Sequence, residues 1–123
     1  MEMIKVESVE DLEVFKRSHR LTIKVYKNTE QFPKSELFGI ISQMRRAAAS
    51  IAANLMEGSH RLNRAEYRQF GGIARGSVGE LKYHFLLAKD LGYLSDKDYT
   101  FLSAEADEIS RMLSGLAKSL ARK

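Results

Sequence analysis

Glutamate and histidine are the residue types here best suited to metal or acid–base chemistry, and they form two short-range pairs. Glu57 and His60 have the Glu-x-x-His spacing that di-iron helical bundles use. Such a site needs a second Glu-x-x-His pair and two further glutamates, and the sequence has no second pair, so we predict no metal site. Glu80 and His84 have the spacing of neighbours on one helix face, and we interpret them as a packing pair.

No other set of residues has the spacing of a catalytic site. Ser50, Ser59, Ser77 and Ser103 lack a matching histidine and aspartate. No strand pattern precedes a glycine-rich phosphate loop, and the absence of cysteine excludes thiolate metal sites and disulfides. We therefore expect no enzymatic activity and no cofactor.

Arginine, which binds phosphate well, is concentrated between residues 45 and 75. This segment holds six arginines and two acidic residues, a difference equal to the net charge of +4 of the whole chain. Such a segment attracts polyanions or an acidic partner, the alternative being a helix surface with solvated arginines. The predicted nucleic-acid contacts are Arg45, Arg46, Arg61, Arg64 and Arg68, assisted by His60, Lys118, Arg122 and Lys123. Tyr67 and Phe70 are assigned to the core, so we predict no base-specific reading.

The composition is that of one globular domain. The chain has 123 residues, of which 44% are hydrophobic and 29% charged. We predict a single domain over residues 8–121 and a short tail at residues 1–7. Neither a signal peptide nor a membrane span is expected, which favours a cytoplasmic protein without membrane contact.

Four apolar-periodic segments predict four helices, at residues 9–29, 35–57, 63–91 and from 96 onward. The predicted core stripes are Leu12, Phe15, His19, Thr22 and Tyr26; Leu37, Ile41, Met44, Ala48, Ile51 and Leu55; Tyr67, Gly71, Ala74, Val78, Leu81, Phe85 and Ala88; and Leu102, Ala106, Ile109, Leu113, Leu116 and Leu120. The predicted boundary residues are Ser8, Ser35, Asn63 and Ser95 as N-caps, and Gly58 and Gly92 as stops. Short connections favour antiparallel neighbours, so the predicted fold is an all-α, up-down four-helix bundle.

Two helices have surfaces that a single bundle would not need. Residues 47–53 carry no charge on any side, which predicts contact beyond the bundle, although alanine is also simply a good helix former. Residues 71–79 hold four glycines, which together cost roughly 4 kcal/mol of helix stability, so we expect close helix–helix packing to offset them. Polar residues on the same surfaces predict an internal hydrogen-bond network. Its predicted members are Ser50, Asn54, Arg75, Ser77 and Glu80.

Several motifs resemble a known family. They are residues 11–15 (DLEVF), 32–33 (FP), 43–51 (QMRRAAASI), 54–58 (NLMEG), 73–81 (IARGSVGEL) and 91–94 (LGYL). In this order they resemble the bacterial four-helix-bundle proteins associated with intervening sequences in 23S ribosomal RNA genes. The resemblance implies a homopentamer without enzymatic activity and with a basic surface for nucleic acid. It also implies kinship with accessory proteins of diversity-generating retroelements, which pair with a reverse transcriptase and its RNA.

Three functions remain open. The first is a homo-oligomeric protein that binds RNA or DNA without sequence specificity, or that assists ribonucleoprotein assembly. The second is a protein-interaction scaffold or accessory subunit for an acidic partner or a reverse transcriptase. The third is an enzyme or cofactor-binding protein.

Overall fold

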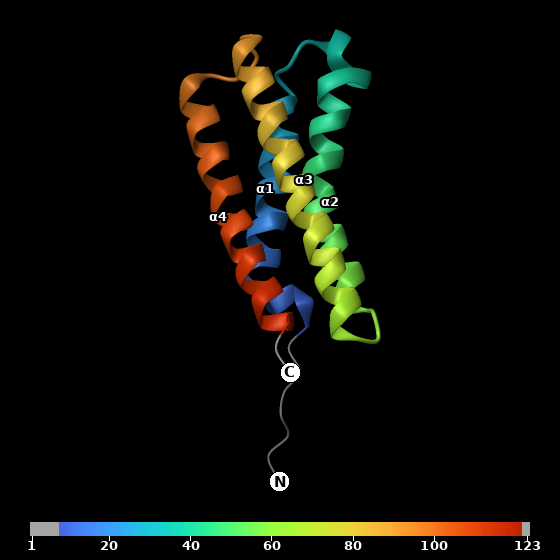
Figure 1. Cartoon of the computed structure of the whole chain (residues 1–123). Coiled ribbons are helices and arrows are strands. Elements are labelled where there is room, and N and C mark those ends of the chain that lie inside the picture. The colour runs from blue at the N-terminus through green and yellow to red at the C-terminus, as the bar shows by residue number, and fades with distance from the viewer. Residues whose placement is uncertain (1–7, 122–123) are drawn as a thin grey trace.

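The computed structural model describes residues 8–121, which form an antiparallel up-and-down bundle of four α-helices (Figure 1). The helices are α1 (Glu13–Thr29), α2 (Ser42–Ser59), α3 (Arg64–Asp90) and α4 (Asp96–Ala121). Shorter helical turns are η1 (Val9–Asp11), η2 (Lys34–Glu36) and η3 (Leu37–Ile41). This range contains no strand, which confirms the all-α prediction; the predicted tail at residues 1–7 lies outside it.

The helices enclose one apolar core. Both α1 and α3 pack against α2 and α4, so α1 lies diagonally across the bundle from α3, and α2 from α4. The largest fully buried apolar side chains come from all four helices and are Phe85, Met44, Ile51, Leu55, Leu81, Leu102, Ile109, Leu113, Val25 and Val78. Apart from Leu37, the predicted stripes of α2, α3 and α4 supply most of this core.

The buried face of α1 differs from the predicted stripe. The residues that enter the core are Val14, Ser18, Leu21, Val25 and Thr29. His19 and Tyr26 are exposed, so the predicted stripe is wrong. Ser18 and Thr29 look polar in the sequence, but each hydroxyl donates to the carbonyl oxygen four residues earlier, at 2.7 Å and 2.8 Å. Because these hydroxyls are satisfied within their own helix, burying them costs little.

The chain enters α1 and α2 less regularly than predicted. Leu12 is extended (φ −71°, ψ 135°), so Ser8 caps only η1 and α1 begins at Glu13. Ser35 lies within η2 rather than capping α2, and Gly39 has non-helical dihedral angles (φ −109°, ψ −117°) inside η3. Leu37, predicted as a core residue, is 47% exposed. Regular helix therefore starts only at Ser42.

Gly58 does not stop α2, contrary to the prediction. Gly58 is buried in the last turn of α2 and does not have the positive φ of a glycine that stops a helix. A Cβ atom at this position would lie 2.8 Å from Phe70 Cβ and 2.9 Å from Tyr67 Cδ1. Gly58 therefore allows the first turns of α3 to pack directly on the backbone of α2.

The boundaries of α3 and α4 agree with the prediction. Asn63 Oδ1 accepts a hydrogen bond from Glu66 N at 2.8 Å and begins α3. Gly92 has φ +83° and directs the chain away from α3. Ser95 Oγ accepts from Asp98 N at 3.0 Å and begins α4.

Candidate functional site

The structure divides the predicted arginines into two groups. Arg45 and Arg46 lie in the first turn of α2, whereas Arg61, Arg64 and Arg68 lie where α3 begins. Arg46 and Arg61 are separated by almost the whole of α2, about 22 Å at 1.5 Å per residue. The five side chains therefore do not form one continuous surface.

Arg45 is engaged inside the chain. Its Nε donates to Thr29 Oγ1 at 2.8 Å, and its terminal nitrogen donates to Tyr26 O at 3.3 Å. The guanidinium carbon also lies 4.6 Å from the centroid of the Tyr26 ring. Arg45 therefore ties α2 to the end of α1, whereas the exposed Arg46 bonds only Gln43, at 3.1 Å.

Arg64 and Arg68 bind the C-terminal carbonyls of α4. Arg64 donates to Ser119 O at 2.6 Å and to Leu120 O at 3.2 Å, and Arg68 Nε donates to Ala117 O at 3.1 Å. Ser119 and Leu120 lie in the last turn of α4, where carbonyls have no partner within the helix, and the helix dipole favours cations at this end. These arginines therefore stabilise the end of α4.

Replacing Arg64 and Arg68 together by alanine should lower the free energy of unfolding by about 1–2 kcal/mol, because the carbonyls of α4 lose their charged donors. Urea unfolding followed by circular dichroism measures the change. The matched control is Arg46→Ala, which removes an exposed arginine and should change stability by less than about 0.5 kcal/mol. Equal effects of the two changes would contradict the capping role.

Arg61 completes the second group. It forms an ion pair with Glu57 at 3.1 Å and lies over the Phe70 ring, 4.7 Å from its centroid. Because an arginine has five N–H donors, Arg61, Arg64 and Arg68 keep donors that face solvent. These exposed arginines can still meet a phosphate, each with fewer free donors than predicted.

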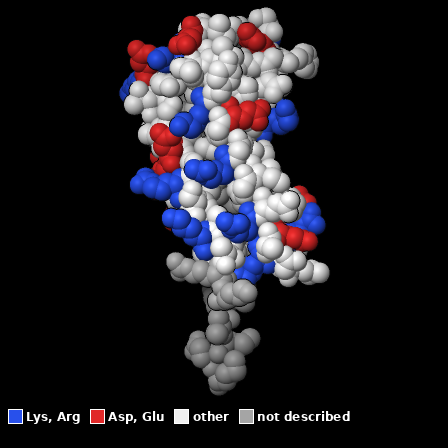
Figure 2. All heavy atoms as spheres, viewed as in Figure 1, with Lys and Arg blue, Asp and Glu red and all other residues white. Residues whose placement is uncertain are grey.

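Lys and Arg gather where α3 begins and α4 ends, on the lower half of the face in Figure 2. Residues 64–77 of α3 carry three arginines and one glutamate, and residues 109–121 of α4 carry two basic residues and no acid. We call this region the basic end; its members are Arg61, Arg64, Arg68, Arg75, Arg111 and Lys118. Lys118 is thus placed near the predicted arginines, whereas Arg122 and Lys123 lie outside the described residues.

A second basic surface lies on α1, where our sequence analysis did not place one. Its members, here called the α1 basic strip, are Lys16, Arg17, Arg20, Lys24 and Lys27. No acidic residue occurs between positions 14 and 29, and at 100° per residue the five cations fall within roughly one third of the helix circumference. This run of charge is visible in the sequence, but the flanking acids Glu10, Asp11, Glu13 and Glu30 reduce the net charge of residues 8–30 to +1.

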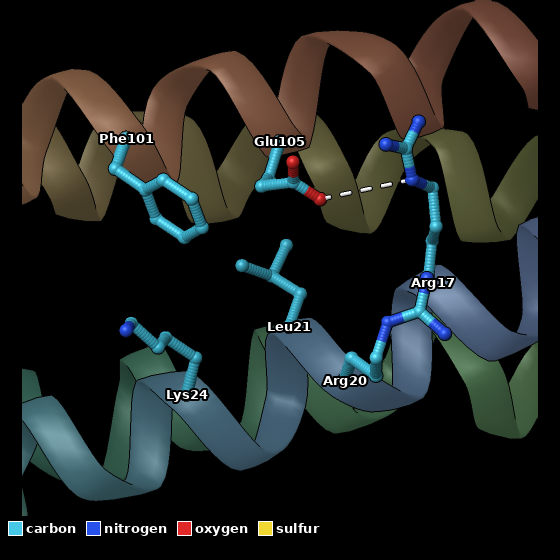
Figure 3. Close-up of a pocket in the computed structure, with 6 residues that line it drawn as sticks. All are labelled: Arg17, Arg20, Leu21, Lys24, Phe101 and Glu105. Carbon is cyan, nitrogen blue, oxygen red and sulfur yellow. Dashed lines mark ion pairs between the residues drawn. The ribbon is translucent and has the colours of Figure 1, made fainter.

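The α1 basic strip borders a groove between α1 and α4 (Figure 3). The groove has a volume of about 280 Å³. Its lining residues are Arg17, Arg20, Leu21 and Lys24 of α1, and Phe101 and Glu105 of α4. Arg17 reaches across to Glu105 at 3.9 Å and to Glu108 at 3.6 Å. Lys24 Nζ lies 5.1 Å from the centroid of the Phe101 ring.

The predicted polar network is smaller in the structure. Ser50 Oγ and Ser77 Oγ are 2.8 Å apart, and Asn54 Nδ2 donates to Ser50 Oγ at 2.9 Å. This chain of bonds connects α2 to α3. Arg75 and Glu80 are exposed and do not join it, which corrects that part of the prediction. Both side chains lie on a side of α3 that faces away from the polar residues of α2. The sequence alone did not show this orientation.

The Glu–His pairs do not converge on a metal. Glu57 is paired with Arg61, and His60 Nδ1 lies 2.9 Å from Met56 O. His84 Nε2 is 3.5 Å from Glu80 Oε2. Among residues 8–121, no three His, Asp or Glu side chains are placed to hold a metal ion together.

Three of the four glycines of α3 form part of an exposed, uncharged line, whereas Gly71 is buried. We call this line the α3 stripe; its members are Ala65, Gln69, Gly72, Gly76, Gly79 and Tyr83, and all are exposed. Their alternating steps of four and three residues keep them on one side of the helix. A Cβ atom at Gly72, Gly76 or Gly79 would meet nothing within 4 Å, so the predicted close packing does not occur within the chain.

The alanines of α2 are divided between core and surface. Ala47 and Ala48 are buried in the chain's own core, with exposures of 3% and 0%, which removes them from the predicted outside contact. Ala53 is exposed, and Ala49 and Ala52 are half-buried.

Together these features define a basic, all-helical bundle protein with an uncharged stripe on α3. Residues 10–115 match the 23S rRNA-intervening sequence protein family, and the chain belongs to this family. A comparison with curated proteins gives no match. None of the helices within residues 8–121 combines the length and hydrophobicity needed to span a bilayer.

A solved structure has the same fold. It is a protein with unknown function from the S23 ribosomal protein family of Bacteroides thetaiotaomicron, with 23% sequence identity and a TM-score of 0.77. The similarity covers 85% of this chain and 98% of the other. At this identity the likeness supports the fold of the bundle.

Proposed function

We propose that this chain is a non-catalytic subunit of a homo-oligomer that binds nucleic acid without sequence specificity and assists ribonucleoprotein assembly. The observation that carries the proposal is the α1 basic strip, whose five cations follow one another along the helix with no acid between them. Phosphate backbones supply closely spaced negative charge, and neutralising them releases counterions. The exposed arginines of the basic end add to this field.

The α3 stripe supports self-association. An exposed line without charges, with glycine at its three central positions, allows the backbone of another helix to approach closely. From Ala65 to Tyr83, a separation of 18 positions, the line is about 27 Å long, enough for several turns of contact. We propose a pentamer, the state that the family resemblance implies, in which five copies of the basic surfaces act together.

The family name agrees with a role near RNA. The matching family is described as 23S rRNA-intervening sequence protein, and the structural neighbour is described as a member of an S23 ribosomal protein family. An accessory role beside an acidic protein or a reverse transcriptase is the alternative outcome of the experiment below.

The test is fluorescence anisotropy with labelled mixed-sequence RNA and DNA, titrated against salt. We expect binding at low salt. The logarithm of the binding constant should fall linearly with the logarithm of the salt concentration, with a slope set by the number of phosphates neutralised. Lys16→Glu with Lys27→Glu should weaken binding about 10-fold or more at low salt, because both are exposed members of the strip. The control is Lys97→Glu, an exposed reversal at the first turn of α4.

Two results would overturn the proposal. One is the absence of binding at low salt, and the other is binding without a salt slope. Co-purification of one stoichiometric acidic protein free of nucleic acid would instead favour the scaffold alternative.

A further inference from the structure

The α1–α4 groove combines cations with an exposed aromatic ring. Lys24 of α1 faces Phe101 of α4, whose side chain is 49% exposed, and Arg20 stands one turn away on α1, beyond Leu21 (Figure 3). Leu21, 3% exposed, forms an apolar floor between them. Positive charge along a groove with an aromatic ring is the combination that single-stranded nucleic acid requires, because phosphates bind the cations while a base stacks on the ring.

The ring of Phe101 is available to a flat or charged group. Lys24 Nζ lies 5.1 Å from the ring centroid, so a flexible side chain covers that face rather than a packed core residue. A lysine is bound there by a weak cation–π attraction and can turn to a phosphate instead. A base that displaces it gains the ring face and brings its own phosphate within reach of the freed ammonium group.

The spacing of the cations suits a strand that runs along α1. Successive members Arg17, Arg20, Lys24 and Lys27 are three or four residues apart, a rise of about 4.5–6 Å each. Glu105 is the acidic member of the groove lining, and it is held by Arg17 at 3.9 Å. Arg17 therefore offsets part of the negative charge of Glu105, and Arg20 and Lys24 remain to face the ligand.

We propose that the α1–α4 groove binds a single strand of RNA or DNA, with a base stacked on Phe101 and phosphates on Arg20 and Lys24. The inference rests on the proposed nucleic-acid binding and adds the site and the strandedness. A duplex keeps its bases stacked inside, so it meets the cations but offers no base to Phe101. An acidic peptide would use the cations and leave the ring without a role.

Self-association through the α3 stripe leaves the groove open. The stripe lies on the outer face of α3, which is the helix diagonal to α1, while the groove lies between α1 and α4. Each subunit of the proposed oligomer therefore presents its own groove.

The experiment compares a labelled uridine oligonucleotide with a mixed-sequence RNA duplex of the same length. Phe101→Ala should weaken binding of the oligonucleotide about 10-fold and leave duplex binding unchanged, and Phe101→Tyr should restore it. Arg20→Ala with Lys24→Ala should weaken binding of both ligands and lower the salt slope for the oligonucleotide by about 1.4. The matched control is Phe38→Ala, which removes an exposed phenylalanine of η3 that belongs neither to the groove nor to the α3 stripe. Circular dichroism checks that every variant is folded.

Each failure has its own meaning. If the unmodified protein binds neither ligand, the proposed function is wrong and the groove with it. If it binds both but Phe101→Ala has no effect on the oligonucleotide, stacking in the groove is wrong while the proposed function stands. Equal weakening of both ligands by Phe101→Ala, or displacement of the oligonucleotide by polyglutamate at equal charge, would also overturn the groove proposal.

Discussion

Replacing Gly58 by alanine should lower the free energy of unfolding by about 2 kcal/mol. The new Cβ would lie 2.8 Å from Phe70 Cβ, closer than such atoms pack, and 3.3 Å from the carbonyl oxygen of Tyr67, which is a tight contact. Phe70 Cβ and Tyr67 O belong to or adjoin the backbone of α3, so the conflict requires a shift of a helix rather than of a flexible side chain. Overpacking of this kind typically costs about 1–3 kcal/mol, which exceeds the gain in helix propensity from removing a glycine.

Gly115→Ala is the matched control for this change. Gly115 is exposed in α4 and a Cβ there would meet nothing within 4 Å, so the substitution should stabilise the protein by about 1 kcal/mol. Urea unfolding at several protein concentrations separates these effects from changes in assembly. A Gly58→Ala protein as stable as the unmodified chain would show that α3 can move away without cost.

Adding a charged side chain to the α3 stripe should abolish self-association. Gly76→Glu places a long, charged group in the middle of a surface that we propose as the contact between copies. Since a Cβ at Gly76 meets nothing within the chain, the isolated bundle should remain folded. Light scattering should change from about five times the chain mass of 14.0 kDa to 14.0 kDa itself.

Ala104→Glu is the control, because it adds the same side chain to an exposed position on α4. Loss of the oligomer should also weaken nucleic-acid binding, since linked sites bind with higher avidity than separate ones. Two outcomes would defeat this prediction: an unmodified protein that is already monomeric, or a Gly76→Glu protein that keeps its mass.

The boundaries that sequence predicts well are those with a local cause. Asn63 and Ser95 accept hydrogen bonds from backbone groups three residues away, and Gly92 supplies a left-handed turn at its own position. The misplaced boundary at Gly58 has a distant cause. That glycine is required by the approach of Phe70 and Tyr67 from the next helix, and a glycine near a helix end is also the usual sign of a stop.

The surface of the bundle was predicted less completely than its core. Arg64 and Arg68 contact residues that are 49 to 56 positions away in the sequence, so no local pattern indicates these contacts. The α1 basic strip does have a local pattern, since its five cations follow one another in the sequence without an acidic residue between them. The groove beside it depends on Phe101 from another helix, and only the packing of α1 against α4 brings the ring to the cations.

Under the proposed function, the end of α4 and a phosphate chain would compete for the same donors of Arg64 and Arg68. The two acceptors are alike, because the carbonyl oxygens of α4 and the oxygens of a phosphate chain both carry negative charge. If a phosphate chain binds there as proposed, each donor that it takes would leave a carbonyl near the end of α4 to water. The winding of the last turn of this helix would then be coupled to occupancy of the basic end, and rising salt, which releases phosphates, would return the donors to the helix.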